Sequence, residues 1–200
     1  SPMISTTEPL LKAFLQAIAP EEDLLPSQWA EKYRMISSEA AGQMIPWRNE
    51  FCPFMVEPMD TFHPDNPSEM TVVKKSIQIC ASEAMNNLWG WIAHSRKQSQ
   101  MLILGTVETM EDYSDLRIKT MIRDTPVLAA IISEDTRDAT NKKLLKNYPG
   151  GFGKMGGANS PVSMRSHPVP YLLGDEVDGW TADAGGEGAP LDILKKRTYA

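Results

Sequence analysis

The sequence has few cysteines and histidines and no long hydrophobic run, and each shortage excludes a class of protein. Its two cysteines form neither a disulfide framework nor a C-x-x-C pair. Its three histidines lie far apart, so no zinc-binding spacing is visible. The apolar stretches fall well short of the ~20 residues that a membrane-spanning helix needs, and the first residues lack a signal-peptide pattern. We therefore expect a cytosolic chain with no membrane span.

An excess of positive charge is missing too. The formal charge is -6 and the isoelectric point is near 5.1. These values argue against a surface that binds nucleic acid over its whole extent, but they leave room for local contact with DNA. With 42% hydrophobic and 23% charged residues, the composition is that of a globular protein. A chain of 200 residues is long enough for one well-packed domain.

Apolar spacing and turn residues predict a lead-in over residues 1–67 that packs on the rest of the chain. The spacing over Pro9–Ala19 is that of a helix. Ser27 is placed to cap a second, short helix over Gln28–Arg34. The remainder of the lead-in is rich in proline and in large apolar residues, so we expect it to be irregular but packed.

Residues 68–200 show a different pattern, in which short apolar runs alternate with segments whose apolar residues have helical spacing. The expected strands are Met70–Val73, Met101–Thr106 and Val169–Leu173, and the expected helices are Glu83–His94, Glu108–Ile122 and a further one from Pro126 to Ile132. Strands separated by helices of this length require crossover connections. We therefore predict an α/β core with a mainly parallel β-sheet flanked by helices.

An apolar run that ends in two acids gives the first chemical signal. Residues 170–173 lead through Gly174 to Asp175 and Glu176. In an open parallel sheet the ligand site lies beyond the carboxyl ends of the strands, so both carboxylates would reach one crevice. There the first can hold Mg²⁺ and the second can polarise a water for attack on a phosphorus atom. A solvated acidic turn after a buried strand is the alternative interpretation.

A second signal runs from strand into helix over residues 71–83. A phosphate cradle needs backbone N–H groups at a helix N-terminus, a cation for the phosphates and a hydroxyl for the metal. Lys75 can supply the cation and Ser82 the hydroxyl. The usual G-x-x-x-x-G-K-[ST] pattern is absent, however, because no glycine opens the loop, Cys80 stands at an expected glycine, and Ala81 at the expected lysine. A simple strand-to-helix turn with a serine cap is the alternative.

Four stretches, in the same order, resemble the ATPase region of the large terminase subunit of tailed double-stranded DNA phages, the lambda-type family. They are residues 27–34 (SQWAEKYR), 53–60 (PFMVEPMD), 121–126 (MIRDTP) and 156–197, which contains GGANS, DEVD, EGAP and KR. Together they span most of the chain, so the resemblance is more specific than any single motif. It implies a P-loop NTPase fold of the RecA-like kind, with ATP and Mg²⁺ as its ligands.

The resemblance also implies roles for individual residues. The lambda-type family uses a deviant Walker A motif whose lysine stands early, and Lys75, Ser76 and Ser82 match that pattern. The residues expected to contact ATP are Lys75, Ser76, Gln78, Ile79, Cys80, Ala81, Ser82 and Glu83. Asp175 would be the Walker B carboxylate, holding Mg²⁺ together with Ser82, and Glu176 would be the catalytic glutamate.

Two positions carry further expectations. Cys80 replaces a glycine of the family, and a Cβ there crowds the backbone where phosphate must approach if the position needs a positive φ. Arg165 is a candidate for stabilising the charge that builds during phosphoryl transfer, although a surface residue or an ion-pair partner is the commoner role for such an arginine.

The resemblance further implies a DNA-packaging motor that moves double-stranded DNA into a procapsid in the host cytoplasm. Its implied partners are a small terminase subunit, the portal protein and other copies of the chain in a ring. The chain ends before the family's next ATPase motif, so we expect a truncated form without the nuclease domain. Two alternatives stay open: a non-hydrolysing scaffold whose Cys80 prevents phosphate binding, and a metal-dependent nuclease built on Asp175, Glu176 and Asp178.

Overall fold

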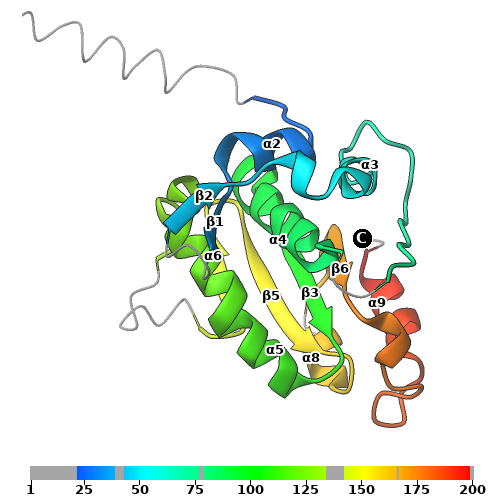
Figure 1. Ribbon diagram of the computed structural model, residues 1–200. Helices are drawn as coiled ribbons and strands as arrows, with labels where there is room; N and C mark the ends of the chain where they lie inside the picture. Colours follow the sequence, from blue (N-terminus) through cyan, green and yellow to red (C-terminus); the bar gives the residue numbers. More distant parts are fainter. Residues whose placement is uncertain (1–21, 39–42, 77–78, 134–141, 166, 199–200) are drawn as a thin grey trace, which may run out of the picture.

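The protein is described by a computed structural model that covers residues 22–38, 43–76, 79–133, 142–165 and 167–198. Its centre is a four-stranded sheet with helices on both faces (Figure 1). The strands are, in spatial order, β4 (Leu145–Tyr148), β5 (Gly151–Gly157), β3 (Gln100–Leu104) and β6 (Tyr171–Gly174). Strand β3 pairs in parallel with both β5 and β6, and β4 runs antiparallel to β5. The mainly parallel sheet flanked by helices confirms the predicted α/β class.

The helices connect these strands and also build the lead-in. They are α2 (Pro26–Tyr33), α3 (Val56–Asp60), α4 (Ala81–Trp91), α5 (Val107–Tyr113), α6 (Lys119–Asp124), α7 (Pro126–Ala129), α8 (Pro161–Arg165) and α9 (Pro190–Thr198). Two π-helical segments continue helices, η3 (Ile92–Arg96) after α4 and η4 (Ser114–Ile118) between α5 and α6. Short 3-10 turns are η1 (Asn49–Phe51), η2 (Pro53–Met55) and η5 (Val177–Gly179), and β1 (Met35–Ser38) forms an antiparallel hairpin with β2 (Gln43–Pro46). In the described part of the chain, no helix combines the length and hydrophobicity that crossing a membrane requires.

Alternation along β3 creates a core on each face of the sheet. Leu102 and Leu104 point to one face, where they join a large cluster with the side chains of α2, α4, α5 and α6. Met101 and Ile103 point to the other face and pack with residues of α8 and α9. All five residues of β3 are buried, as expected for a central parallel strand covered on both sides.

The lead-in shares the first of these cores. Trp29 of α2 and Trp47 after β2 are fully buried in the same cluster as Trp89 of α4. Ser27, predicted to cap the second helix, instead lies inside α2, because the helix begins at Pro26. Its N–H and its hydroxyl donate to the two carboxylate oxygens of Asp60, at 2.9 and 2.7 Å. The helix predicted over residues 9–19 lies outside the described residues.

One strand assignment from the sequence needs correction, and one strand was not predicted. Met70–Val73, predicted as a strand, has no regular secondary structure, and three of its side chains are exposed. Within the described residues no strand pairs with it, and an unpaired strand leaves its backbone groups without partners. Conversely, the glycine-rich stretch 151–157 is strand β5. Its Gly153 lies where a Cβ would come within 2.6 Å of the Trp89 ring, so this strand packs closely because the side chain is absent.

Candidate functional site

Asp175 lies directly after β6, at the carboxyl edge of the sheet, and the backbone around it is tightly held. Its N–H donates to the Ile103 carbonyl at 3.2 Å, which continues the pairing with β3 for one more residue. Its carbonyl accepts from the Trp180 indole at 2.9 Å, and its carboxylate accepts from the Glu176 N–H at 2.9 Å. The Asp175 side chain is only 10% exposed, so its position is fixed by the fold.

A hydroxyl and an ammonium from a distant segment meet this carboxylate. Ser82, in the first turn of α4, donates its hydroxyl to Asp175 Oδ2 at 2.7 Å across 93 positions of sequence. Lys75 places its Nζ 3.2 Å from Asp175 Oδ1. The structure therefore brings together three of the residues that the sequence analysis selected, on one carboxylate and at the edge where parallel sheets bind ligands.

The loop between these two residues ends in a left-handed turn. Cys80 precedes α4 with φ 57° and ψ 12°, and its carbonyl accepts the first helical hydrogen bond from Ala84 at 3.0 Å. Ala81 is the first residue of α4, and Ile79 offers its carbonyl to the Cys52 thiol. As in any α-helix, the first N–H groups of α4 have no acceptor within the helix and lie at the positive end of the helix dipole. They can therefore donate hydrogen bonds to an anion. Gln78, an expected ATP contact, lies outside the described residues, and Ser76 is exposed.

Glu83, another residue expected to contact ATP, lies in the first turn of α4, where it forms ion pairs with two arginines. Its carboxylate pairs with Arg34 at 2.9 Å and with Arg117 at 3.4 Å. Arg34 is almost fully buried, and burial lowers its pKa while the Glu83 charge opposes that shift. The hydroxyl of Tyr113 donates to Asn86 at 2.7 Å and lies 3.3 Å from the Ser82 carbonyl. Glu83 is therefore held by two arginines behind the loop.

Arg34 and Tyr113 were not selected from the sequence. Burial raises the pKa of Tyr113 well above its usual value, so this phenol is a neutral hydrogen-bonding group. Arg34 ends the stretch SQWAEKYR that contributes to the family resemblance, but that stretch assigned it no role, and Tyr113 lies in none of the four stretches. Each acts on the loop through contacts across the fold, which a single sequence does not display.

The two expected catalytic residues differ in their surroundings. Glu176 follows Asp175 directly, is exposed, and has φ 53° and ψ 40°. Arg165 ends α8 and is ion-paired with Glu187. The sequence alternative of an ion-pair partner therefore describes Arg165 in this structure, whereas Glu176 is available to solvent beside the Asp175 cluster.

Backbone strain concentrates at the same place. Among the described residues, three non-glycine residues have positive φ: Cys80, Lys97 and Glu176. Such conformations cost about 1–3 kcal/mol and gather at functional sites. Cys80 lies between Lys75 and Ser82 in the sequence and Glu176 directly follows Asp175, so two of the three belong to this site.

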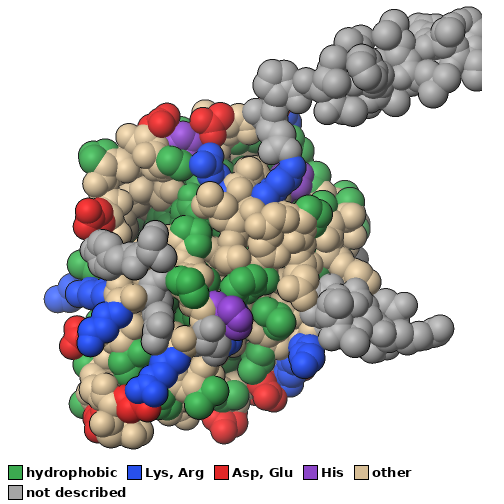
Figure 2. Space-filling model, turned by 180° about the vertical axis from the view of Figure 1, so that it is seen from behind, with side chains coloured by type: hydrophobic (Ala, Val, Ile, Leu, Met, Phe, Trp, Pro, Cys, Tyr) green, Lys and Arg blue, Asp and Glu red, His purple; other side chains and the backbone are tan. Residues whose placement is uncertain are grey.

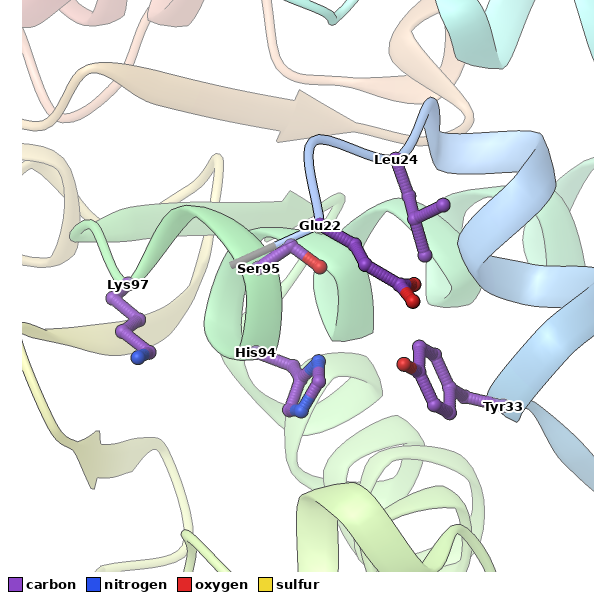
Figure 3. Close-up of a pocket in the computed structure, with 6 residues that line it drawn as sticks. All are labelled: Glu22, Leu24, Tyr33, His94, Ser95 and Lys97. Atoms are coloured by element: carbon purple, nitrogen blue, oxygen red, sulfur yellow. The ribbon is translucent and has the colours of Figure 1, made fainter. Parts of the chain in front are cut away.

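A surface pocket lies elsewhere. Its lining comes from Tyr33 and the segment before α2, and from the end of η3, where His94 and Lys97 contribute (Figure 3). His94 is about 18 Å along the helix from Ser82, at 1.5 Å per residue. His94 Nδ1 accepts from the Trp29 indole at 3.1 Å, which ties this wall to the core. The pocket is therefore separate from the carboxylate cluster.

The donor set fits a magnesium-bound triphosphate. Asp175 and Ser82 present two oxygen ligands of the kind that Mg²⁺ prefers. Lys75 supplies a cation for phosphate oxygens, and the start of α4 supplies N–H donors. In this structure the ammonium and the hydroxyl both interact with Asp175, so the three groups that such a ligand would need lie together.

The fold and the cluster define an α/β protein in which a lysine and a serine before and within a helix start face a strand-end carboxylate. A comparison with protein families finds that residues 41–200 match the phage terminase large subunit gpA, ATPase domain. The chain therefore belongs to this family, and the predicted resemblance to the terminase large subunit is confirmed. Searches of curated proteins and of solved structures gave no match. Membership implies an ATPase and the use of nucleotide.

Proposed function

We propose that this chain is a P-loop ATPase domain whose ATP hydrolysis drives double-stranded DNA into a procapsid. The observation that carries the proposal is the meeting of Lys75, Ser82 and Asp175 at distances of 3.2 and 2.7 Å. Family membership supports ATP as the substrate. We further propose that residues 75–82 form a deviant Walker A loop and that Lys75 is its phosphate-binding lysine, and both proposals rest on this geometry.

Each residue has a chemical task in the proposed reaction. Lys75 exchanges Asp175 for phosphate oxygens when ATP binds, and the N-terminal N–H groups of α4 hold the same phosphates. Asp175 and Ser82 would hold Mg²⁺, which when bound neutralises charge on the phosphates. Glu176 orients a water and accepts its proton as the water oxygen attacks the γ-phosphorus and ADP leaves. Arg165 contributes only if it is released from Glu187.

The motor partners follow from the family. We propose double-stranded DNA, a small terminase subunit, the portal protein and a ring of chains, acting in the host cytoplasm. Figure 2 shows the side of the molecule that faces away from the viewer in Figure 1. On this side the Lys and Arg side chains of the described residues are interspersed with Asp and Glu. Among the described residues, Lys143 pairs with Glu111 and Asp115 at 3.3 and 2.9 Å. Such a surface suits weak, salt-sensitive contact with DNA better than tight binding.

The test compares two pairs of variants in ATP binding and in phosphate release. Lys75→Ala should weaken Mg·ATP binding by at least about tenfold, whereas Lys74→Ala, which removes the neighbouring exposed lysine, should bind as the wild type does. Glu176→Gln should keep the wild-type affinity and lose about 10²–10⁴ in turnover because the water loses its base. Asp178→Asn, which changes the next exposed acid, should turn over normally.

Three results would count against the proposal. Unchanged affinity in Lys75→Ala would remove the phosphate-binding role from this loop. A folded wild-type protein without nucleotide affinity would favour the scaffold alternative. Metal-dependent DNA cleavage without nucleotide, lost in Asp178→Asn, would favour the nuclease.

A further inference from the structure

Two thiols that are distant in sequence meet beneath the phosphate loop. Cys52 is 1% exposed, between η1 and η2. Its Sγ donates a hydrogen bond to the carbonyl of Ile79 at 3.0 Å, the residue before Cys80. Burial raises the pKa of the Cys52 thiol to about 11, and the nearby Cys80 acts in the same direction. Because Ile79 directly precedes Cys80, the hydrogen bond to its carbonyl places the Cys52 thiol beside the backbone that carries Cys80, although the two cysteines lie in unrelated sequence contexts.

The pair combines an accessible thiol with a protected one. Cys80 is exposed and Cys52 is buried, and both are free. A reagent in solution therefore reaches Cys80 first, and Cys52 is the adjacent thiol that can react next. These are the two cysteines of the whole sequence, so any thiol chemistry of the chain belongs to them.

The position of the pair links it to the candidate site. Cys80 is the residue immediately before α4, two positions ahead of Ser82. Lys75 lies in the segment that connects Cys52 to Cys80. A covalent bond between the two cysteines would therefore close a loop that contains the phosphate-binding lysine and end that loop at the start of the helix.

We propose that Cys80 and Cys52 form a thiol modification site, which a small-molecule disulfide converts into an intramolecular disulfide that closes the phosphate loop to nucleotide. The Cys80 sulfur attacks the reagent disulfide, forms a mixed disulfide and releases one reagent thiol. The Cys52 sulfur then attacks Cys80, forms the protein disulfide and releases the second reagent thiol. The two protein thiols are oxidised, the reagent is reduced to two thiols, and the two protons pass to those leaving groups.

Closure follows from the arrangement of the loop. Lys75 and Ser82 both interact with Asp175 in this structure, and in the proposed reaction Lys75 must exchange that carboxylate for phosphate oxygens. A disulfide at Cys80 holds the loop in its left-handed conformation and restricts the movement of Lys75. This second half of the inference rests on the proposed function, whereas disulfide formation does not.

The test treats the whole chain with oxidised glutathione and then with a reductant. Mass spectrometry should show the loss of two hydrogen atoms and the disappearance of both alkylatable thiols. The affinity for Mg·ATP should fall by at least about tenfold and return after reduction. Cys52→Ser, which keeps a donor for the Ile79 carbonyl, should retain glutathione on Cys80 as a mixed disulfide and form no internal disulfide. Cys80→Ser lacks the exposed thiol. Its affinity for Mg·ATP should be the same before and after the treatment.

The outcomes separate the two halves. A mixed disulfide with glutathione on Cys80 and no internal disulfide would overturn the pairing. An internal disulfide with unchanged ATP affinity, in a protein that binds ATP when reduced, would overturn the closure. An internal disulfide in a protein that binds no ATP when reduced would overturn the proposed function while the thiol site stands.

Discussion

At the scale of single residues, Cys80 and Glu176 hold left-handed backbone conformations beside the candidate site. Glycine adopts this conformation without steric cost, whereas a side chain is strained there. The strain is therefore located at the turn before α4 and at the turn after β6, the two turns from which the proposed phosphate loop and the proposed catalytic carboxylate come. Lys97, at the end of η3, has the same conformation away from the site and provides a comparison.

Cys80→Gly should stabilise the fold by up to about 1 kcal/mol and also tighten Mg·ATP binding. The strain is relieved, and no Cβ remains where the backbone approaches phosphate. Lys97→Gly should stabilise the fold by a similar amount but leave nucleotide affinity unchanged. Chemical denaturation and equilibrium binding measure the two effects. An unchanged affinity in Cys80→Gly would mean that the Cβ does not crowd the phosphates.

At the scale of elements, the first turn of α4 is fixed by charges from two other segments. Arg34 follows α2 and approaches Glu83 from the interior, where its side chain is 5% exposed. Arg117, in η4, reaches the same carboxylate from the surface, where it is 62% exposed. The lead-in therefore positions the loop through a buried ion pair, and the surface pair adds little.

Arg34→Met should destabilise the protein by about 3 kcal/mol, because Glu83 loses its buried partner while the volume of the side chain is largely kept. Arg117→Met should cost less than about 1 kcal/mol. Denaturant unfolding of the two variants measures the difference. Equal costs would show that the buried pair is no more important than the exposed one.

At the scale of the whole molecule, the lead-in and the α/β core pack around shared tryptophans. Gly90 of α4 allows this contact, because a Cβ there would come within 2.4 Å of the Trp29 ring. Trp29 is fully buried and cannot move aside. The joint between the two parts of the chain therefore depends on the absence of one side chain.

Gly90→Ala should destabilise the whole molecule, because overpacking of about 1–3 kcal/mol or more exceeds the ~1 kcal/mol that alanine gains in a helix. Gly105→Ala, where nothing lies within 4 Å of the added Cβ, serves as the matched control and should change stability little. Unfolding followed by tryptophan fluorescence and by far-ultraviolet circular dichroism should give coincident transitions. Two separated transitions in the wild type would show that the lead-in unfolds independently.

Strands and helices could be predicted where burial follows local pattern. The strand predicted over Val169–Leu173 overlaps β6 (Tyr171–Gly174), and the one predicted over Met101–Thr106 overlaps β3 (Gln100–Leu104). Both were recognisable because buried parallel strands are continuous apolar runs. The similar run Met70–Val73 is not a strand, since strand formation also needs a pairing partner. The β1 and β2 hairpin and β4 escaped notice because short strands carry weak patterns.

The sequence by itself determined the chemistry of the candidate site: a lysine and a serine before and within a helix start, and two acids after an apolar strand, in the order of a family whose membership is now shown. Only the tertiary structure decided which groups meet. It placed Lys75 and Ser82 on Asp175, paired Arg165 with Glu187, and brought the Cys52 thiol to the Ile79 carbonyl beside Cys80. The reason is physical: residue identity fixes what a group can do, whereas contacts between distant segments depend on packing that no local pattern encodes.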